Sequence, residues 1–238
     1  MLPLTKQNAY REKYKRLRPG WQTSGDEFEA LARRYISPAA RVLDLGCGRG
    51  GVMELFWQSV RRVVGVDPDF ASLAERRVKM PAVCGRAEGL PLEAGKFDLA
   101  IGLWVLEHLP RPEAALREIG RVLARGGHFI FLTPNALHPL IWANRLSWAM
   151  PAVQRLLVPR LYGRAEADTF RTYYRANTPA RLRRLAGACG FDVVSQHAIR
   201  DPSYLAFGEL TFRLSALLEA MLPNEWGVHL IGDWRKAS

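Results

Sequence analysis

Short apolar runs alternate with amphipathic segments from residue 41 onward. A run of about four to eight apolar residues is typical of a buried strand, and apolar positions at helical spacing predict a helix that covers the sheet. Strands are expected at residues 41–45, 62–66, around 83, 97–103, 128–133, 191–198 and 228–234. Helices are expected at residues 50–60, 70–79, 112–124 and 178–189. This alternation predicts an α/β fold with a Rossmann-like, doubly wound, mostly parallel sheet of seven strands.

Two long stretches interrupt the alternation, at residues 136–177 and 200–226. Each follows the carboxyl end of an expected strand, which is the edge where open α/β sheets bind their ligands. We therefore expect both stretches, together with residues 1–35, to form helical cap elements on the substrate side. Residues 38–135 are then the expected cofactor-binding core, and 238 residues suffice for one domain of this kind.

The clearest chemical signal is a glycine-rich turn after the first expected strand. Gly46, Gly48 and Gly51 match the G-x-G-x-x-G spacing of a dinucleotide site. Cys47 lies within this turn, and Asp44 precedes it. In a nicotinamide site that carboxylate would repel the pyrophosphate at the helix N-terminus. S-adenosylmethionine carries an ammonium and a sulfonium group instead, and a nearby carboxylate stabilises both, so the pattern favours this cofactor.

Asp67 ends the next expected strand and is followed by Pro68. An acidic side chain at this place accepts hydrogen bonds from both ribose hydroxyl groups of a nucleoside cofactor. The alternative interpretation is a turn residue at a strand end. Because Asp44 stands in the same frame one strand earlier, we predict that Asp67 binds the ribose.

Five motifs follow one another along the core: LDLGCGRG, VGVDPD, GRAEGLPL, the stretch from FDL to LEHL, and the stretch from RVL to GG. Their order and spacing resemble those of class I S-adenosylmethionine-dependent methyltransferases of the type 11 group, over residues 38–135. The resemblance implies S-adenosylmethionine as the cofactor and methyl transfer as the activity. It also implies that the cofactor site includes Pro68, Ala87, Glu88, Leu103 and Trp104.

Arg86 departs from the family pattern, which usually has Asp at this place. That Asp accepts a hydrogen bond from the adenine amino group, and arginine has no acceptor. Three alternatives stay open: Glu88 accepts instead, Arg86 stacks on the adenine, or the backbone at Ala87 and apolar neighbours hold the ring. Arg86 is counted among the predicted cofactor-binding residues.

Methyl transfer mainly needs the acceptor aligned with the methyl group, but a hydroxyl acceptor also needs a base. His108 follows the fourth expected strand at the ligand edge, and histidine titrates near neutral pH. We therefore predict His108 as the catalytic base; the alternative is a histidine that caps a helix or packs under the neighbouring prolines. His138, Tyr173 and Tyr174 are further candidates. Ubiquinone-type O-methyltransferases have a metal-binding Glu where this chain has Trp104, so no metal is predicted.

Composition bears on the partner and the compartment. The chain carries 34 basic and 23 acidic residues, a net charge of +11, with arginine predominating. This excess reflects either codon composition or an anionic partner such as a phospholipid surface, a lipid-phosphate-linked substrate or nucleic acid. Three separated cysteines indicate a reducing compartment. With no signal peptide and no apolar span of about 18 residues, we expect a cytoplasmic protein, alternatively peripheral to the inner face of the membrane.

The two interrupting stretches leave their role open. Residues 137–162 mix tryptophan and leucine with arginine, and residues 204–222 predict an apolar-rich helix. One interpretation is a cap in which the two segments pack together and bury Trp142 and Trp148. The other is a basic, tryptophan-bearing surface that contacts anionic membrane or a lipid-linked substrate. The arginines expected on that surface include Arg145, Arg155 and Arg160.

Residues 170–178 and 229–236 loosely resemble bacterial methyltransferases of surface-glycan assembly. The first function hypothesis is therefore O-methylation of a sugar or lipid-linked glycan. The alternatives are O-, N- or C-methylation of a quinone or polyketide-type small molecule, a basic nucleic-acid-binding protein with this fold, and a degenerate fold that only binds a partner. Nucleic acid is the partner least expected, because the chain has no Asn-Pro-Pro-Tyr type base-clamping motif.

Overall fold

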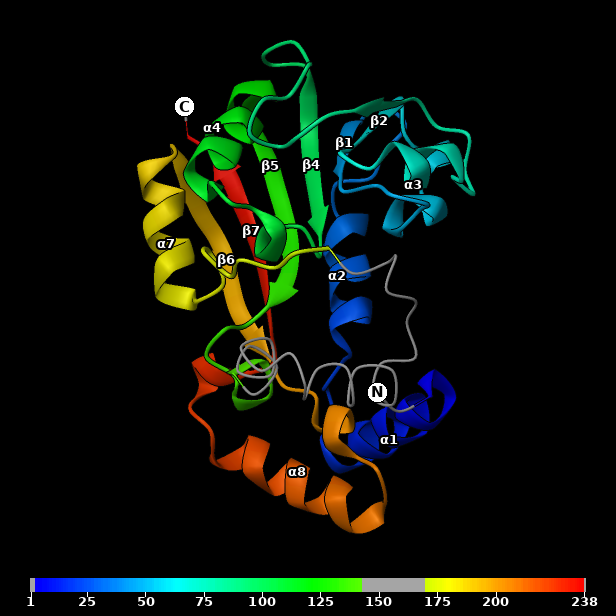
Figure 1. Cartoon of the computed structure of the whole chain (residues 1–238), viewed down its shortest axis with the longest axis vertical. Helices are drawn as coiled ribbons and strands as arrows, with labels where there is room; N and C mark the ends of the chain where they lie inside the picture. Colours follow the sequence, from blue (N-terminus) through cyan, green and yellow to red (C-terminus); the bar gives the residue numbers. More distant parts are fainter. Residues whose placement is uncertain (1–2, 143–169, 238) are drawn as a thin grey trace.

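The computed structural model describes residues 3–142 and 170–237 (Figure 1). Within these residues seven strands form one sheet in the order β3-β2-β1-β4-β5-β7-β6. The strands are β1 (Arg41–Leu45), β2 (Arg62–Asp67), β3 (Ala82–Cys84), β4 (Phe97–Leu103), β5 (Leu123–Pro134), β6 (Phe191–Ile199) and β7 (His229–Lys236). The strands from β1 to β5 pair in parallel, and β7 runs antiparallel to both neighbours. The predicted fold class is confirmed.

The described helices are α1 (Leu4–Leu17), α2 (Ser24–Arg33), α3 (Phe70–Ala74), α4 (Pro112–Val122), α7 (Pro179–Ala188) and α8 (Glu209–Met221). Short 3-10 helices are η1 (Val52–Leu55), η2 (Trp57–Ser59), η3 (Leu106–His108), η5 (Pro202–Leu205) and η6 (Asn224–Trp226). The start of α7 follows the expected pattern, because the Thr178 side chain accepts a hydrogen bond from the Arg181 amide at 3.3 Å and Pro179 occupies the first turn.

Two of the expected helices are shorter than predicted. Residues 50–60 form only η1 and η2, since two glycines at the start carry a high entropic cost and the aromatic and β-branched residues that follow favour helix weakly. The helix expected at 70–79 ends at Ala74. There a tertiary contact competes with the helix: the Arg77 amide donates to the Arg49 carbonyl at 3.0 Å, and its guanidinium pairs with Glu54.

Buried apolar side chains form two core layers, one on each face of the sheet. On one face, α4 and α7 pack residues such as Leu116 and Leu182 against the fully buried Trp234 of β7. On the other face, Phe28 of α2 and Met53 of η1 pack against β1, β2 and β4. The two layers hold the carboxyl ends of the parallel strands in register, and the loops that follow those ends build the site described below.

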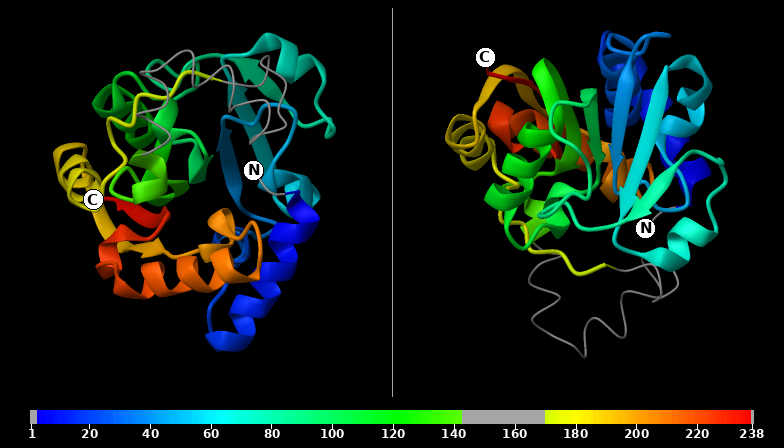
Figure 2. Two further views of the ribbon diagram at one scale, coloured as in Figure 1. Left: turned by 60° about the horizontal axis from the view of Figure 1, so that its bottom comes forward. Right: turned by 90° about the horizontal axis from the view of Figure 1, so that it is seen from above.

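The first helix and the segment after β6 meet at one end of the sheet (Figure 2). Tyr10 of α1 stacks on Phe212 of α8 with ring centroids 5.0 Å apart. His138, near the start of the first interrupting stretch, makes a buried hydrogen bond with Glu219 of α8, with its Nε2 atom 2.9 Å from the carboxyl oxygen. That stretch therefore begins against α8, as the cap interpretation expects.

Exposure of the apolar side chains bears on the two interpretations of this end. Trp142 is 64% exposed, so it is not buried against α8 as a cap predicts. The outer face of α8 also exposes apolar side chains, namely Leu210, Leu214, Leu217, Leu218 and Met221. Trp148 and the arginines at 145, 155 and 160 lie outside the described residues. Across the described part of the chain, none of the helices has the length and apolar character needed to span a bilayer.

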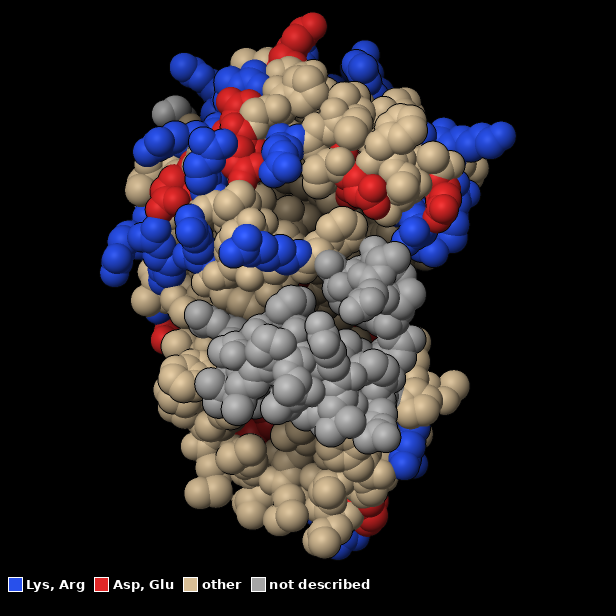
Figure 3. Space-filling model, in the orientation of Figure 1, with Lys and Arg blue, Asp and Glu red and all other residues tan. Residues whose placement is uncertain are grey.

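Charged side chains are distributed unevenly over the face seen in Figure 1. Lys and Arg gather over α4 and α7, whereas the end formed by α8 shows few charges (Figure 3). On this face the basic side chains therefore lie mainly over two helices that cover one side of the sheet.

The pairing of β5 with β7 generates a stability prediction. Gly232 lies opposite Phe131, and a Cβ at Gly232 would collide with the buried Phe131 ring, which packs 4.9 Å from Trp234. Gly232→Ala should lower the free energy of unfolding by about 1 to 3 kcal/mol, because the core has no room for the methyl group. Gly187→Ala in α7, with open space around it, is the control and should not destabilise. Equal urea midpoints for the two variants would contradict this packing.

Candidate active site

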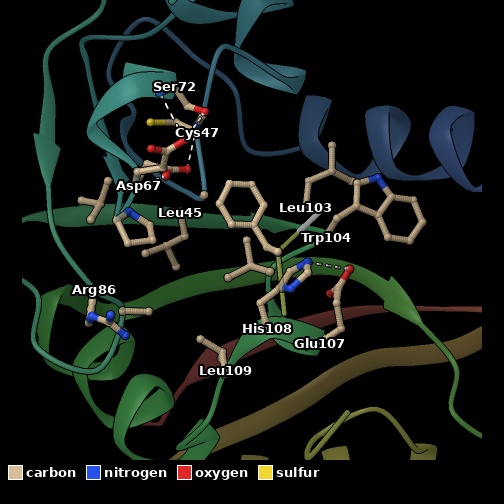
Figure 4. A pocket seen from close by; sticks show the side chains of 18 of the residues that line it. Leu45, Cys47, Asp67, Ser72, Arg86, Leu103, Trp104, Glu107, His108 and Leu109 are labelled. Atoms are coloured by element: carbon tan, nitrogen blue, oxygen red, sulfur yellow. Dashed lines mark hydrogen bonds and ion pairs between the residues drawn. The ribbon is translucent and has the colours of Figure 1, made fainter. Parts of the chain in front are cut away.

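A pocket of about 970 Å³ opens at the carboxyl ends of β1, β2 and β4 (Figure 4). Every residue predicted for the cofactor site lines it, and so does the predicted base His108. These residues are Asp44, Gly46, Cys47, Gly48, Asp67, Pro68, Arg86, Ala87, Glu88, Leu103, Trp104 and His108. Asp67 and Cys47 lie at one end, and Trp104, Glu107 and His108 lie at the other. The parallel register brings these residues together from loops that are separate in the sequence.

The turn after β1 requires glycine at two positions. Gly46 has φ +68°, and a Cβ there would come within 2.6 Å of the Val105 side chain. Gly48 has φ +44°, also in the left-handed region that favours glycine. The Gly46 amide donates to the Val66 carbonyl at 2.8 Å, which ties the turn to β2. The turn therefore presents backbone rather than side chains to the pocket.

Asp67 has a structural task that the sequence did not reveal. Its Oδ2 accepts a hydrogen bond from the Gly48 amide at 2.9 Å, and its Oδ1 accepts one from the Asp69 amide at 2.8 Å. The carboxylate thus fixes the glycine turn against β2. Each carboxylate oxygen has a further lone pair, so the predicted ribose contact is compatible with these bonds.

Asp44 is 4% exposed, and its Oδ2 atom is buried without a hydrogen-bond partner in the described part of the chain. Burial raises the pKa of Asp44 to about 7, and the negative charge of Asp67 adds to this effect. A buried carboxyl group with an unused oxygen carries a large desolvation cost. A cationic ligand in the pocket would offset that cost.

The third loop brings Arg86, Ala87 and Glu88 to the pocket. Arg86 is exposed, whereas the Oε1 atom of Glu88 is buried and has no hydrogen-bond partner among the described residues. An amino group is the natural donor to such an atom. Of the three alternatives for holding the adenine, this geometry supports Glu88.

His108 ends η3, directly after β4. Its Nδ1 atom lies 2.9 Å from the Arg171 carbonyl oxygen, which only accepts, so Nδ1 carries the proton and donates. Burial lowers the pKa of His108, so the ring is neutral near pH 7. In that tautomer Nε2 holds the free lone pair. Neighbouring Trp104 has φ +58° and places its ring edge-on to His229, with centroids 4.8 Å apart.

Glu107 was not predicted as a site residue, although it belongs to the LEHL motif. Its side chain is buried and accepts a hydrogen bond from Thr133 at 2.9 Å, and burial raises the pKa of Glu107 to about 7. Its Oε1 lies 3.9 Å from His108 Nε2. Its carbonyl accepts hydrogen bonds from the amides of Tyr173 and Tyr174, at 2.7 and 3.2 Å. Glu107 therefore links the histidine to a distant segment.

That segment, residues 170–174, forms the far wall of the pocket. Tyr173 and Tyr174 line it, as two of the further candidates, whereas His138 does not. Of the three stretches expected to form the cap, only this part of residues 136–177 borders the pocket within the described residues. Helix α1 packs against α8 and α2 packs against the sheet, and neither α1, α2 nor the segment 200–226 lines the pocket.

The comparisons with known proteins agree with this site. A family model described as a methyltransferase domain matches residues 43–131. An uncharacterized methyltransferase of Synechocystis is 33% identical over 70% of this chain and 74% of that protein. A ubiquinone biosynthesis O-methyltransferase of Bordetella avium is 32% identical over 48% of this chain and 61% of that protein. The chain spans 43% to 61% of the length of the first three curated relatives.

Solved structures show the same fold. An S-adenosylmethionine-dependent methyltransferase of Mesorhizobium loti superposes with a TM-score of 0.58 at 16% identity, over 88% of this chain and 98% of that one. The fold, the glycine turn and these relatives together define a class I Rossmann-like methyltransferase domain. The chain belongs to the S-adenosylmethionine-dependent methyltransferases.

The pocket fits S-adenosylmethionine on its own geometry. The unpartnered oxygen of Asp44 suits a cation, and the glycine turn lines the pocket with backbone at Gly46 and Gly48. Asp44, Asp67 and the turn would hold the methionine and ribose portions, and Glu88 with Ala87 would hold the adenine.

Asp67→Ala should weaken the binding of S-adenosylmethionine by about 2 to 3 kcal/mol, because a charged acceptor is lost and the glycine turn is released. Isothermal titration calorimetry measures this directly. Asp192→Asn, which removes an exposed carboxylate far from the pocket, serves as the control. An Asp67→Ala protein that binds like wild type would refute the role of this residue.

Glu88→Leu and Arg86→Leu separate the alternatives for adenine. Loss of a buried hydrogen-bond acceptor should weaken cofactor affinity about tenfold or more in Glu88→Leu, while Arg86→Leu should change it little. Both affinities are measured by the same titration, with thermal melts as the folding control. The reverse ranking would show that Arg86, and not Glu88, contacts the ring.

Proposed function

We propose that the protein transfers a methyl group from S-adenosylmethionine to a hydroxyl oxygen of a small acceptor, with His108 as the general base. One observation carries this proposal. The Arg171 carbonyl holds the proton of His108 on Nδ1, so the free lone pair of the neutral ring is on Nε2. A neutral imidazole that lines the cofactor pocket is the group a hydroxyl acceptor needs.

When bound, S-adenosylmethionine supplies a methyl group on a positively charged sulfur, and that sulfur becomes neutral once the methyl group has left. The protein's residues do the rest. His108 Nε2 accepts the proton that the acceptor hydroxyl loses as its oxygen forms the bond to carbon. The imidazolium that results lies 3.9 Å from Glu107, whose carboxylate stabilises it. The wall at residues 170–174 narrows the space in which the acceptor oxygen is aligned.

The acceptor is best described as a ring with a free hydroxyl group. Trp104, Phe170 and Tyr173 line the histidine end of the pocket and offer flat apolar surfaces on which a ring packs. We favour a sugar, free or on a lipid-linked glycan, because the wall lies in the segment that resembles glycan methyltransferases. The aromatic lining supports a ring of either polar or aromatic character.

A phenol of the quinone type is the second candidate. The observation that favours it is the similarity to a ubiquinone biosynthesis O-methyltransferase of Bordetella avium. A phenol has a pKa near 10, far below that of a sugar hydroxyl, so a weaker base is enough to remove its proton. Release of S-adenosylhomocysteine with sugar and phenol acceptors, tested side by side, distinguishes the two candidates.

His108→Ala should lower kcat with an accepted substrate by about a hundredfold or more and leave cofactor affinity unchanged, because only the proton acceptor is lost. The control is His197→Ala, an exposed histidine paired with Glu27 on the surface. In wild type the rate should rise with pH to a plateau, with its half-maximal value below pH 6.5, because burial lowers the pKa of His108 from 6.5 and the neutral form is active. A His108→Ala enzyme with full activity would rule out the base.

A further inference from the structure

A second hollow lies beside the histidine end of the active-site pocket, with a volume of about 470 Å³. Pro110 borders both hollows. The charged side chains that line the second one are Arg111, Glu113, Arg117, Arg175 and Arg181. We refer to it as the basic groove. It lies on the face where Lys and Arg gather over α4 and α7 (Figure 3).

Four guanidinium groups face one carboxylate in the basic groove. Arg181 pairs with Glu113, and Arg175 donates to the Pro110 carbonyl at 2.6 Å. The guanidinium groups of Arg111 and Arg117 make no ion pair and no hydrogen bond with any residue that the structure describes. Two cations are thus left without a partner among the described residues. Arg111 is the N-cap residue of α4, where the positive end of the helix dipole adds to the repulsion between cations.

Like charges held together in this way are stabilised by an anion. A guanidinium group presents a planar fork of N–H donors that matches two oxygens of a phosphoryl group. A carboxylate carries one charge, whereas a phosphate monoester or a diphosphate carries about two or more. The excess of positive charge in the basic groove therefore matches a phosphoryl group better than a carboxylate.

The wall of the active site continues into the basic groove. Tyr173 lines the active-site pocket, and Arg175, two residues further on, lines the groove. Both Arg171 and Arg175 lie over the Tyr173 ring, at 5.0 and 5.7 Å from its centroid. A molecule with a ring against Tyr173 and an anionic group beyond it would span the two hollows past Pro110.

We propose that the basic groove binds a phosphoryl group of the methyl acceptor, so that the substrate class is a phosphorylated or diphosphate-linked small molecule. This inference rests on the proposed function for its use in catalysis, but the groove is testable by binding alone. Arg111 and Arg117 are its specificity-determining residues, and they act on the acceptor rather than on the cofactor.

The first experiment measures binding of inorganic pyrophosphate to the full chain by calorimetry at low salt. Wild type should bind it, and Arg111→Gln/Arg117→Gln should bind at least about tenfold more weakly, since two charged hydrogen-bond donors are lost. The matched control is Arg125→Gln/Arg184→Gln, which removes the same charge from exposed positions outside the groove. No binding by wild type, or equal loss in both double variants, would overturn the proposal.

Competition then identifies the source of the phosphoryl group. Glucose 1-phosphate should displace pyrophosphate from wild type, and glucose should not. Displacement by phosphatidylglycerol vesicles or by an RNA oligonucleotide, but not by the sugar phosphate, would assign the groove to a membrane or to nucleic acid and overturn the proposal.

Turnover separates this inference from the proposed function. With matched phosphorylated and unphosphorylated acceptors, wild type should prefer the phosphorylated one by about tenfold or more in kcat/KM, and the groove variant should lose that preference while its cofactor affinity holds. Methyl transfer without any preference for the phosphorylated acceptor would overturn the groove assignment and leave the proposed function standing. Loss of turnover in His108→Ala tests the proposed function independently of the groove.

Discussion

Two buried carboxyl groups at the ends of neighbouring parallel strands determine which ligand charge the site favours. Asp44 on β1 and Asp67 on β2 are both nearly inaccessible to water, and the charge of Asp67 adds to burial in raising the pKa of Asp44. Asp67 is held by backbone amides, but one oxygen of Asp44 has no such support among the described residues. Burial of the Asp44 carboxyl group carries a desolvation cost, and a ligand with positive charge would offset that cost.

The strands and the cofactor pocket could be predicted because their signals are local. Each strand is a short apolar run between turn residues, and the glycine turn with Asp44 lies within one continuous segment. The helix expected at 70–79 fails for a reason outside that segment, namely the hydrogen bond from Arg77 to Arg49. Sequence also showed Asp67 only as a ligand contact, since its bond to Gly48 depends on the pairing of β1 with β2.

The acceptor end was harder to predict because it is assembled from distant parts of the chain. Glu107 accepts hydrogen bonds from the Tyr173 and Tyr174 amides, which are far away in the sequence, and from Thr133 on β5. These partners cannot be found from the LEHL motif alone. The cap expected from residues 1–35 and the two interrupting stretches borders the pocket only at residues 170–174 within the described residues, because α1 and α8 pack on each other instead. We therefore propose two separate roles. The core holds the cofactor, and the wall formed by residues 170–174 selects the acceptor together with the basic groove.

The affinity for S-adenosylmethionine as a function of pH tests the central role of Asp44 most directly. With the pKa of Asp44 at about 7 in the free protein, the carboxyl group is protonated below that pH and must lose its proton to pair with the cation. Between about pH 5.5 and 7.5, affinity should therefore rise with pH, by up to about tenfold per unit on the acid side. Asp44→Asn should bind more weakly and show no such rise. A wild-type affinity that stays constant over this range, or that follows the same curve as Asp44→Asn, would contradict the account.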